Sequence, residues 1–254
     1  MAASLKGRPL VRRFPEKVGP YMGFAVAVVF PLTSLLFRRR WHGLEHIPDR
    51  GPAIVAVNHV SYADPLIFGR FVWDAGRIPR YLAKSSLFEL PFPLGRIMTG
   101  AGQIPVHRGA ADAAQSLRGA VDALGRGELV LIYPEGTVTR DPGFWPMRGK
   151  TGVARLALLA PDVPVVPVGQ WGAQAFLDVY HRRFRPLPRT RITISAGKPV
   201  DLSDFTGAEP TADVLEAMTD RIMRAVRDQV AFVRGEAAPE AFHVHRTDRP
   251  ERPR

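Results

Sequence analysis

The sequence contains no cysteine, and this absence excludes disulfide bonds, a cysteine nucleophile, iron–sulfur clusters and zinc sites built from thiolates. It also lacks the G-x-S-x-G segment of serine hydrolases and the H-E-x-x-H segment of zinc hydrolases. A chain of 254 residues buries about three quarters of its unfolded surface, so it can hold a hydrophobic core without such supports. We expect neither a metal ion nor a tightly bound cofactor.

Acidic residues are scarce relative to basic ones, since 24 Asp and Glu against 35 Lys and Arg give a net charge of +11. Such an excess indicates an anionic partner, which can be nucleic acid, a membrane surface or a phosphorylated substrate. Residues 1–40 carry eight basic residues and one acidic residue, and residues 181–191 carry five arginines and no acid. Because the charge is concentrated there and no RNA-binding module is recognisable, we expect an anionic membrane partner and no nucleic acid.

Charged residues are absent from residues 18–37, which as one helix would be about 30 Å long, the thickness of a bilayer core. Pro20 and Pro31 interrupt this run, and the basic residues 38–40 follow it. We expect residues 1–40 to anchor the chain to the cytoplasmic face of the plasma membrane. The anchor is either a single spanning helix or a kinked helix lying in one leaflet, and a buried core helix is the alternative.

From residue 53 onward, predicted strands alternate with predicted helices. The strands are expected at 53–57, 103–106, 129–133, 163–168 and 191–196, and the helices at 65–72, 111–124, 150–159 and 211–234. This alternation predicts an α/β fold with a mostly parallel central sheet flanked by helices, following the N-terminal helical anchor. Prolines in 163–168 place that strand at a sheet edge or its prolines at strand ends.

We expect the α/β domain to span residues 41–235. The remaining segment, 236–254, is rich in Pro, Arg and Glu and is expected to be disordered. In sheets of this kind, functional residues lie in the loops at the carboxyl ends of the strands.

His59 and Asp64 follow the first of these strands, five residues apart. A histidine titrates near neutral pH, so it can accept a proton from a hydroxyl, and a nearby carboxylate can orient its ring. The alternative is a surface histidine and an aspartate that caps the helix beginning at Pro65. Ser61 is interpreted as a turn residue, because the sequence offers no elbow around a serine nucleophile. Backbone N–H groups after this strand are the expected oxyanion donors.

A second polar cluster follows the strand at 129–133. Gly136 permits close backbone approach, and Thr137 and Arg140 can hold a phosphate or a glycerol hydroxyl, although a plain polar turn is the alternative. Arg108 follows a third strand and offers a second cation. The segment 148–151 lacks the glycine that a phosphate loop requires at 144, so we reject a nucleoside triphosphate site and assign Lys150 a supporting contact with an acidic ligand.

Four segments in this order resemble the motif blocks of the glycerolipid acyltransferase family, which includes the 1-acyl-glycerol-3-phosphate acyltransferases. They are Asn58-His59-x4-Asp64, Gly102-x-Ile104-Pro105-Val106-x-Arg108, Pro134-Glu135-Gly136-Thr137 and the segment 163–168. The resemblance covers about residues 41–200. It implies transfer of a fatty acyl group from acyl-CoA or acyl-carrier protein to the sn-2 hydroxyl of 1-acyl-glycerol 3-phosphate, giving phosphatidic acid without an acyl-enzyme.

The resemblance also implies a role for each matching residue. His59 would be the general base, Asp64 would orient it, and Asn58 would support them. The glycerol phosphate would be positioned by Arg108, Glu135, Gly136, Thr137 and Arg140, and the acyl pocket would be shaped by Val165 and Pro167.

Many members of the family read E-G-T-R-S, whereas Arg140 stands two positions later here, which leaves the acceptor open. Glycerol 3-phosphate and other lysophospholipids are therefore alternative acceptors. A non-catalytic basic membrane-binding protein and a lipid hydrolase are alternatives of other classes.

Overall fold

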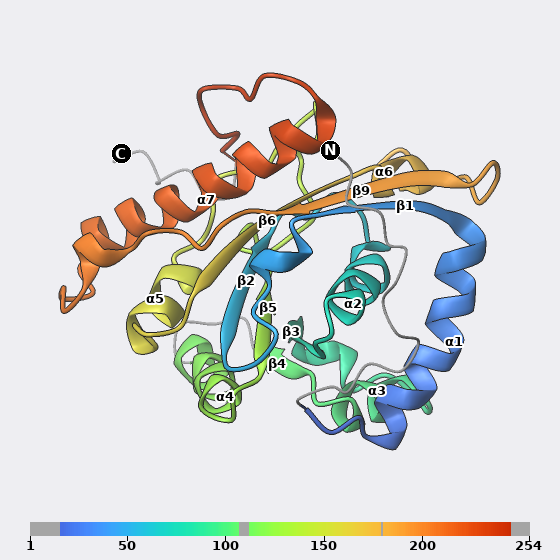
Figure 1. Cartoon of the computed structure of the whole chain (residues 1–254), viewed down its shortest axis with the longest axis horizontal. Helices are drawn as coiled ribbons and strands as arrows, with labels where there is room; N and C mark the ends of the chain where they lie inside the picture. The colour runs from blue at the N-terminus through green and yellow to red at the C-terminus, as the bar shows by residue number, and fades with distance from the viewer. Residues whose placement is uncertain (1–15, 107–111, 179, 245–254) are drawn as a thin grey trace, which may run out of the picture.

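The computed structural model describes residues 16–106, 112–178 and 180–244, and it has one seven-stranded sheet in the order β1-β9-β6-β2-β5-β3-β4 (Figure 1). The strands of this sheet are β1 (Phe37–His42), β2 (Ala53–Val57), β3 (Pro79–Lys84), β4 (Ile104–Val106), β5 (Leu129–Ile132), β6 (Val165–Trp171) and β9 (Thr190–Ala196). A short antiparallel pair is formed by β7 (Leu177–Asp178) and β8 (Arg183–Phe184).

Helices cover both faces of the sheet (Figure 1). They are α1 (Pro20–Leu36), α2 (Asp64–Asp74), α3 (Leu94–Gly100), α4 (Asp112–Gly125), α5 (Gly152–Leu159), α6 (Ala173–Phe176) and α7 (Ala212–Arg234). Strands β2 to β6 run in one direction, and β9 is antiparallel to β6 while β1 is parallel to β9. The predicted α/β fold with a mostly parallel sheet is confirmed.

The central strand β2 is buried on both faces, which is why its sequence is an uninterrupted apolar run. Ala53, Val55 and Val57 pack into the cluster beneath α2. Ile54 and Ala56 pack into the opposite cluster beneath α4, α5 and α7. The sheet therefore separates two hydrophobic cores, and both hold β2 in place.

Helix α7 begins and ends at residues suited to those positions. The Thr211 hydroxyl accepts a hydrogen bond from the Val214 N–H, and Gly235 takes the left-handed conformation just beyond the last turn. The buried residues between them recur every three or four positions and face β6: Leu215, Met218, Thr219, Ile222, Met223, Val226 and Val230. At Gly169 of β6 a side chain would meet the backbone of α7, so the two elements are in direct contact.

Strand β6 is an interior strand, so the expected edge position is wrong, whereas Pro164 stands directly before the first residue of the strand, as the alternative of prolines at strand ends predicts. It lies between β2 and β9. Pro167 is tolerated because the pairing of β6 with β9 covers Val168 to Trp171 and does not include it. The Pro167 carbonyl still accepts from the Gly197 N–H at 2.8 Å, and the N–H that proline lacks lies outside the paired residues.

The basic residues 38–40 form part of strand β1, which the sequence did not predict. Side chains alternate along a strand, so Arg38 and Arg40 are exposed while Arg39 lies half-buried on the other face, near Arg70 and Asp74. Arg38 and Arg40 are therefore the two arginines of this run that face the solvent.

The predicted apolar N-terminal helix is present as α1, with Pro20 in its first turn and Pro31 inside it. It packs against α2 and α3, and the Phe30 ring lies edge-to-face on Trp73 at 5.3 Å. Among the described residues, no helix combines the length and apolar character needed to cross a bilayer. Residues 1–15 lie outside the described residues.

The segment 236–244 differs from the expected disordered tail. The His243 carbonyl accepts from the Arg148 N–H at 3.0 Å, and Arg227 donates to the Pro239 carbonyl at 2.7 Å. These contacts attach the segment to α7 and to the loop after β5, a long-range pairing that composition does not reveal. The rest of the expected tail, 245–254, lies outside the described residues.

Candidate active site

The carboxyl ends of β2, β5 and β6 lie side by side, because β2 pairs in parallel with both of the other strands. The turn 58–63 follows β2, the loop 133–151 follows β5, and α6 follows β6. Residues far apart in the sequence therefore meet at one edge of the sheet, as expected for a parallel α/β fold.

His59 and Asp64 form a hydrogen-bonded pair at this edge. The His59 Nδ1 lies 2.7 Å from the Asp64 Oδ2. The Asp64 side chain is fully buried, and that of His59 is 13% exposed. Because Nδ1 is taken by the carboxylate, the remaining ring nitrogen, Nε2, is the one available to a substrate proton.

The position of Asp64 is fixed by the start of α2. Its Oδ2 also accepts from the N–H groups of Val60 and Ser61, at 2.7 and 2.9 Å. Burial raises the pKa of Asp64, whereas the hydrogen bonds from His59 and the two N–H groups act to lower it. Asp64 is the first residue of α2 and does not cap it, because Ala63 is at the N-cap position and makes no side-chain cap hydrogen bond. The donors to Asp64 all precede it in the sequence, so its carboxylate orients His59 and closes the turn after β2.

These hydrogen bonds bear on the backbone N–H groups that were expected to act as oxyanion donors. The N–H groups of Val60 and Ser61 donate to Asp64, and the N–H of His59 donates to Glu135. The N–H groups of His59, Val60 and Ser61 are thus occupied by carboxylates, so these three are not available as oxyanion donors.

Glu135 lies beneath His59 rather than facing the solvent. Its Oε1 accepts from the His59 N–H and its Oε2 from the Met147 N–H, both at 2.9 Å. The residue is only 2% exposed, and burial raises its pKa to about 8 against the effect of the two N–H donors. The expected contact with glycerol phosphate is not what the structure shows, because both oxygens are used to hold backbone together.

The ring of His59 is also positioned by aromatic and backbone contacts. It stacks on Tyr133 with centroids 4.3 Å apart and an interplanar angle of 25°. The His59 carbonyl accepts from the Thr139 N–H at 2.7 Å. The imidazole is therefore held by Asp64, by Tyr133 and by the loop after β5.

Asn58 supports the site through Gln170, a residue that sequence reasoning missed. The Asn58 Nδ2 donates to the Gln170 carbonyl, and the Gln170 N–H and Nε2 donate back to Asn58. Both residues are fully buried. A polar residue inside the apolar strand β6 was the available signal, but its partner lies 112 positions away in the sequence.

The sequence of this chain is similar to those of known acyltransferases. The family model described as Acyltransferase matches residues 38–171, more than half of the chain. The chain belongs to this acyltransferase family. The matched range contains His59, Asp64 and Glu135 and ends at the last residue of β6.

Curated relatives include a 1-acyl-sn-glycerol-3-phosphate acyltransferase from Limnanthes douglasii, 33% identical over 65% of this chain and 55% of the relative. Tafazzin from Drosophila melanogaster is 30% identical over 71% of this chain and 50% of its own length. The chain thus spans about half the length of these two relatives. A crystal structure of the 1-acyl-sn-glycerophosphate acyltransferase PlsC from Thermotoga maritima shares the fold, with a TM-score of 0.59, 19% identity, and coverage of 87% and 92% of the two chains.

The other polar residues predicted for this acyltransferase site lie around the loop after β5. Gly136 and Arg140 are exposed and Thr137 is half-buried. Gly136 has a φ of 69°, and Lys150 Cδ would lie 3.3 Å from a side chain placed there. Lys150 thus lies over the turn that carries Gly136. Arg108 lies outside the described residues.

The expected acyl-pocket residues of this acyltransferase are packed inside the core. Val165 is 1% exposed and belongs to the cluster beneath α7. Pro167 is buried against Gly197. Both face neighbouring elements, so in this structure neither lines an open cavity. Within the described part of the chain, no group of three or more His, Asp or Glu residues is placed to hold a metal ion.

Replacing Glu135 by Gln tests the buried carboxyl. In the native protein the folded state holds a proton that the unfolded state releases, because folding raises the pKa from 4.5 to about 8. The free energy of unfolding should therefore fall as pH rises through this window, by up to about 1.4 kcal/mol per unit. Urea unfolding at pH 5 to 8 should show this slope for the native protein and a flatter one for Glu135→Gln. Equal slopes would contradict the assignment, and exposed Glu209→Gln is the control.

Proposed function

We propose that this acyltransferase moves a fatty acyl group from a thioester donor to the sn-2 hydroxyl of 1-acyl-glycerol 3-phosphate, giving phosphatidic acid. The observation that carries the proposal is the His59–Asp64 pair, with a nitrogen–oxygen distance of 2.7 Å at the carboxyl end of β2. Relatives named 1-acyl-sn-glycerol-3-phosphate acyltransferase support the acceptor. Neither a hydrolase nor a non-catalytic membrane protein is favoured by these relatives.

The proposed reaction begins when the acceptor hydroxyl gives its proton to His59 Nε2. Its oxygen then attacks the thioester carbonyl, and the new ester bond forms as the carbon–sulfur bond breaks. The leaving thiolate takes the proton back from the His59 imidazolium, so the products are phosphatidic acid and a free thiol. Asp64 stays ionised and stabilises the imidazolium between the two proton transfers.

Direct attack is supported by the lack of cysteine and by the contacts of Ser61. The sequence has no cysteine, and the buried hydroxyl of Ser61 donates to the Leu177 carbonyl at 2.8 Å. General-base assistance contributes roughly 10²–10⁴-fold to the rate. Holding hydroxyl and thioester together can contribute about 7–11 kcal/mol more.

The acceptor phosphate is proposed to bind at the exposed turn after β5. Arg140 and Lys150 carry positive charge there, and Gly136 lets a ligand approach the backbone closely. Arg108 stays a prediction for the same phosphate. With Glu135 held by backbone N–H groups, recognition of the phosphate depends on these cations and on Thr137.

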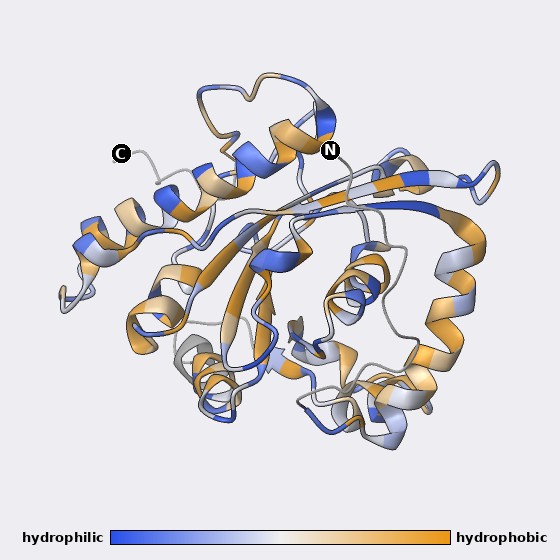
Figure 2. Cartoon of the chain, in the orientation of Figure 1, coloured by the Kyte–Doolittle hydropathy of each residue, from blue (hydrophilic) through white to orange (hydrophobic). Residues whose placement is uncertain are grey.

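We propose that α1 lies along an anionic membrane, on the cytoplasmic face of the plasma membrane. Figure 2 shows hydrophobic residues along much of α1, at the margin of the molecule. Its exposed apolar residues recur three or four positions apart: Tyr21, Phe24, Val28, Leu32 and Leu35. Arg189 donates to the carbonyls of Ser34 and Phe37, which brings the basic segment 181–191 beside the end of this helix.

The catalytic pair is tested by His59→Ala and Asp64→Asn. Both variants should lose about 10²–10⁴-fold in kcat, because one removes the base and the other its orienting charge. The measurement is transfer of labelled acyl groups to 1-acyl-glycerol 3-phosphate, glycerol 3-phosphate and lysophosphatidylcholine by protein in detergent. Exposed His181 pairs with Asp178 at 2.6 Å, so His181→Ala is a matched control with native activity. Full turnover by His59→Ala would overturn the mechanism.

The membrane proposal is tested by Phe24→Ser combined with Leu35→Ser. This variant should bind vesicles that contain phosphatidylglycerol at least tenfold more weakly, because two exposed apolar contacts with the lipid are lost. Leu159 is similarly exposed on α5, so Leu159→Ser is the control and should bind like the native protein. Co-sedimentation with vesicles measures the difference. Equal binding by all three proteins would contradict the proposal that α1 contacts the membrane.

A further inference from the structure

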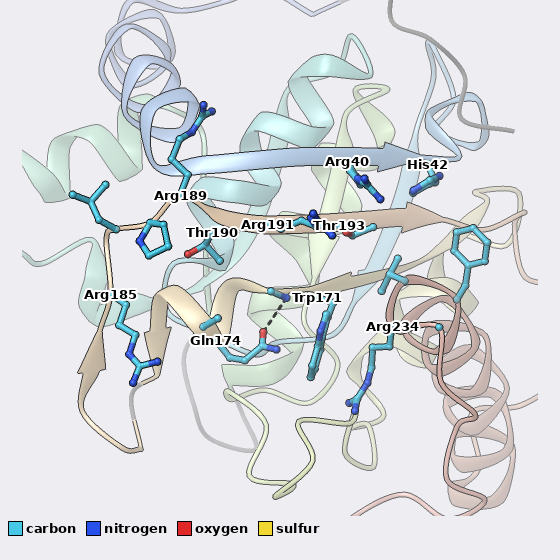
Figure 3. Close-up of a pocket in the computed structure, with 17 residues that line it drawn as sticks. Arg40, His42, Trp171, Gln174, Arg185, Arg189, Thr190, Arg191, Thr193 and Arg234 are labelled. Atoms are coloured by element: carbon cyan, nitrogen blue, oxygen red, sulfur yellow. Dashed lines mark hydrogen bonds between the residues drawn. The ribbon is translucent and has the colours of Figure 1, made fainter.

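The last side chain of α7, that of Arg234, packs against two tryptophan rings and is only 9% exposed. Its guanidinium carbon lies 4.0 Å from the ring centroid of Trp145 and 4.0 Å from that of Trp171. Figure 3 shows Arg234 and Trp171 side by side at the edge of a groove. A cation shielded from water and placed over aromatic rings is attracted to them. Arg234 therefore joins three elements, which are α7, strand β6 and the loop after β5.

Every nitrogen of this guanidinium also has a hydrogen-bond acceptor. Nη1 donates to the Gly143 carbonyl at 2.6 Å. Nε donates to the Glu236 carboxylate at 3.0 Å, and Nη2 donates to the same oxygen. Because its nitrogens are engaged and its side chain is enclosed, Arg234 is not offered to a substrate phosphate, and it acts through the protein.

The turn that Arg234 contacts has a strained backbone. Phe144 has a φ of 58°, a left-handed conformation that residues other than glycine rarely adopt. The Asp141 carboxylate accepts from the N–H groups of Gly143 and Trp145, on either side of Phe144, at 2.9 and 3.1 Å. Arg234 contacts the same two residues, through the Gly143 carbonyl and the Trp145 ring. Such a conformation persists only where surrounding contacts over-determine it, so Arg234 helps to keep the turn in this shape.

Two hydrogen bonds connect this turn to the catalytic base. The Trp145 carbonyl accepts from the Thr139 hydroxyl at 2.7 Å, and the Thr139 N–H donates to the His59 carbonyl at 2.7 Å. Thr139 is only 1% exposed, so little water competes for these bonds. A displacement of Trp145 is therefore passed to the backbone that carries the His59 ring.

A second connection runs through β6. Trp171 follows Gln170, whose N–H and side-chain amide donate to Asn58, the residue before His59. Asn58 and Gln170 are fully buried. Arg234 therefore contacts both elements that hold the backbone of residues 58 and 59, which are the loop after β5 and strand β6.

We propose that Arg234 is a positioning residue for the catalytic base. By fixing the loop after β5 against β6, it sets the place of the His59 backbone and so the direction of Nε2. The inference rests on the proposed role of His59 as the base. It adds a residue from α7, which lies outside the range 38–171 that the family model matches. Arg234 makes and breaks no bond itself, so its effect is on the geometry of the proton transfer.

The first test is kinetic and uses Arg234→Leu, which removes the donors and the charge but leaves an apolar side chain against the two rings. The kcat for acyl transfer should fall roughly 10–100-fold, because a small displacement of a catalytic group is costly, and the KM values for donor and acceptor should stay native. Exposed Arg224 lies on the same helix, so Arg224→Leu is the matched control for charge. Thr211→Ala removes the hydrogen bond at the start of α7 and controls for stability. Both controls should keep the native kcat.

The second test observes His59 without substrate, by ¹⁵N NMR of protein labelled at histidine. The ring signals of His59 should shift in Arg234→Leu and stay in place in Thr211→Ala. Thr139→Val leaves Arg234 unchanged but breaks the bond to the Trp145 carbonyl, so it should also shift these signals. This second variant decides the proposal if Arg234→Leu does not fold.

The two substitutions should also be non-additive, because both break the same connection. Arg234→Leu combined with Thr139→Val should lose no more kcat than the more impaired single variant. Additive losses would overturn the proposal. So would a rise confined to KM, a native kcat in Arg234→Leu, or a lower kcat with native His59 signals. If the native protein acylates no acceptor, the proposed function fails, while the His59 signals still decide whether Arg234 positions that ring.

Discussion

One carboxylate oxygen organises the catalytic edge of this protein. The Oδ2 of Asp64 accepts hydrogen bonds from the His59 ring and from the N–H groups of Val60 and Ser61. These contacts close the turn after β2 and set the start of α2. They also leave one nitrogen of His59 for the substrate. Because an ionised acceptor makes stronger hydrogen bonds than a neutral one, burial of this charge is offset by the bonds that it organises.

The same turn is held from its other sides by buried polar groups on β5 and β6. Glu135 joins the backbone of His59 to that of Met147. Gln170 joins Asn58 to strand β6. Burial of the charged Glu135 carboxylate carries a free-energy cost, which is visible in the raised pKa of this residue. Asp64 and Glu135 offset this cost through the hydrogen bonds that hold His59 in position.

The sequence was sufficient where the contacts are local and insufficient where they are not. His59 and Asp64 were predictable, because they are five residues apart at the junction of an obvious strand and helix. Glu135 was assigned to the ligand, because nothing local shows that its partners are N–H groups 76 and 12 positions away. The mostly parallel sheet followed from the alternation of elements. The interior position of β6 did not, because its prolines are accommodated by the particular point at which β9 stops pairing.

The most direct test of this account is the tautomer of His59, observed by ¹⁵N NMR of protein labelled at histidine. The signal is assigned by its loss in His59→Asn. The account predicts a proton on Nδ1, held by Asp64, and an unprotonated Nε2 in neutral His59, with the preference lost in Asp64→Asn. A proton on Nε2 of neutral His59 in the native protein would contradict it, because that nitrogen could not then accept the proton of the acceptor hydroxyl.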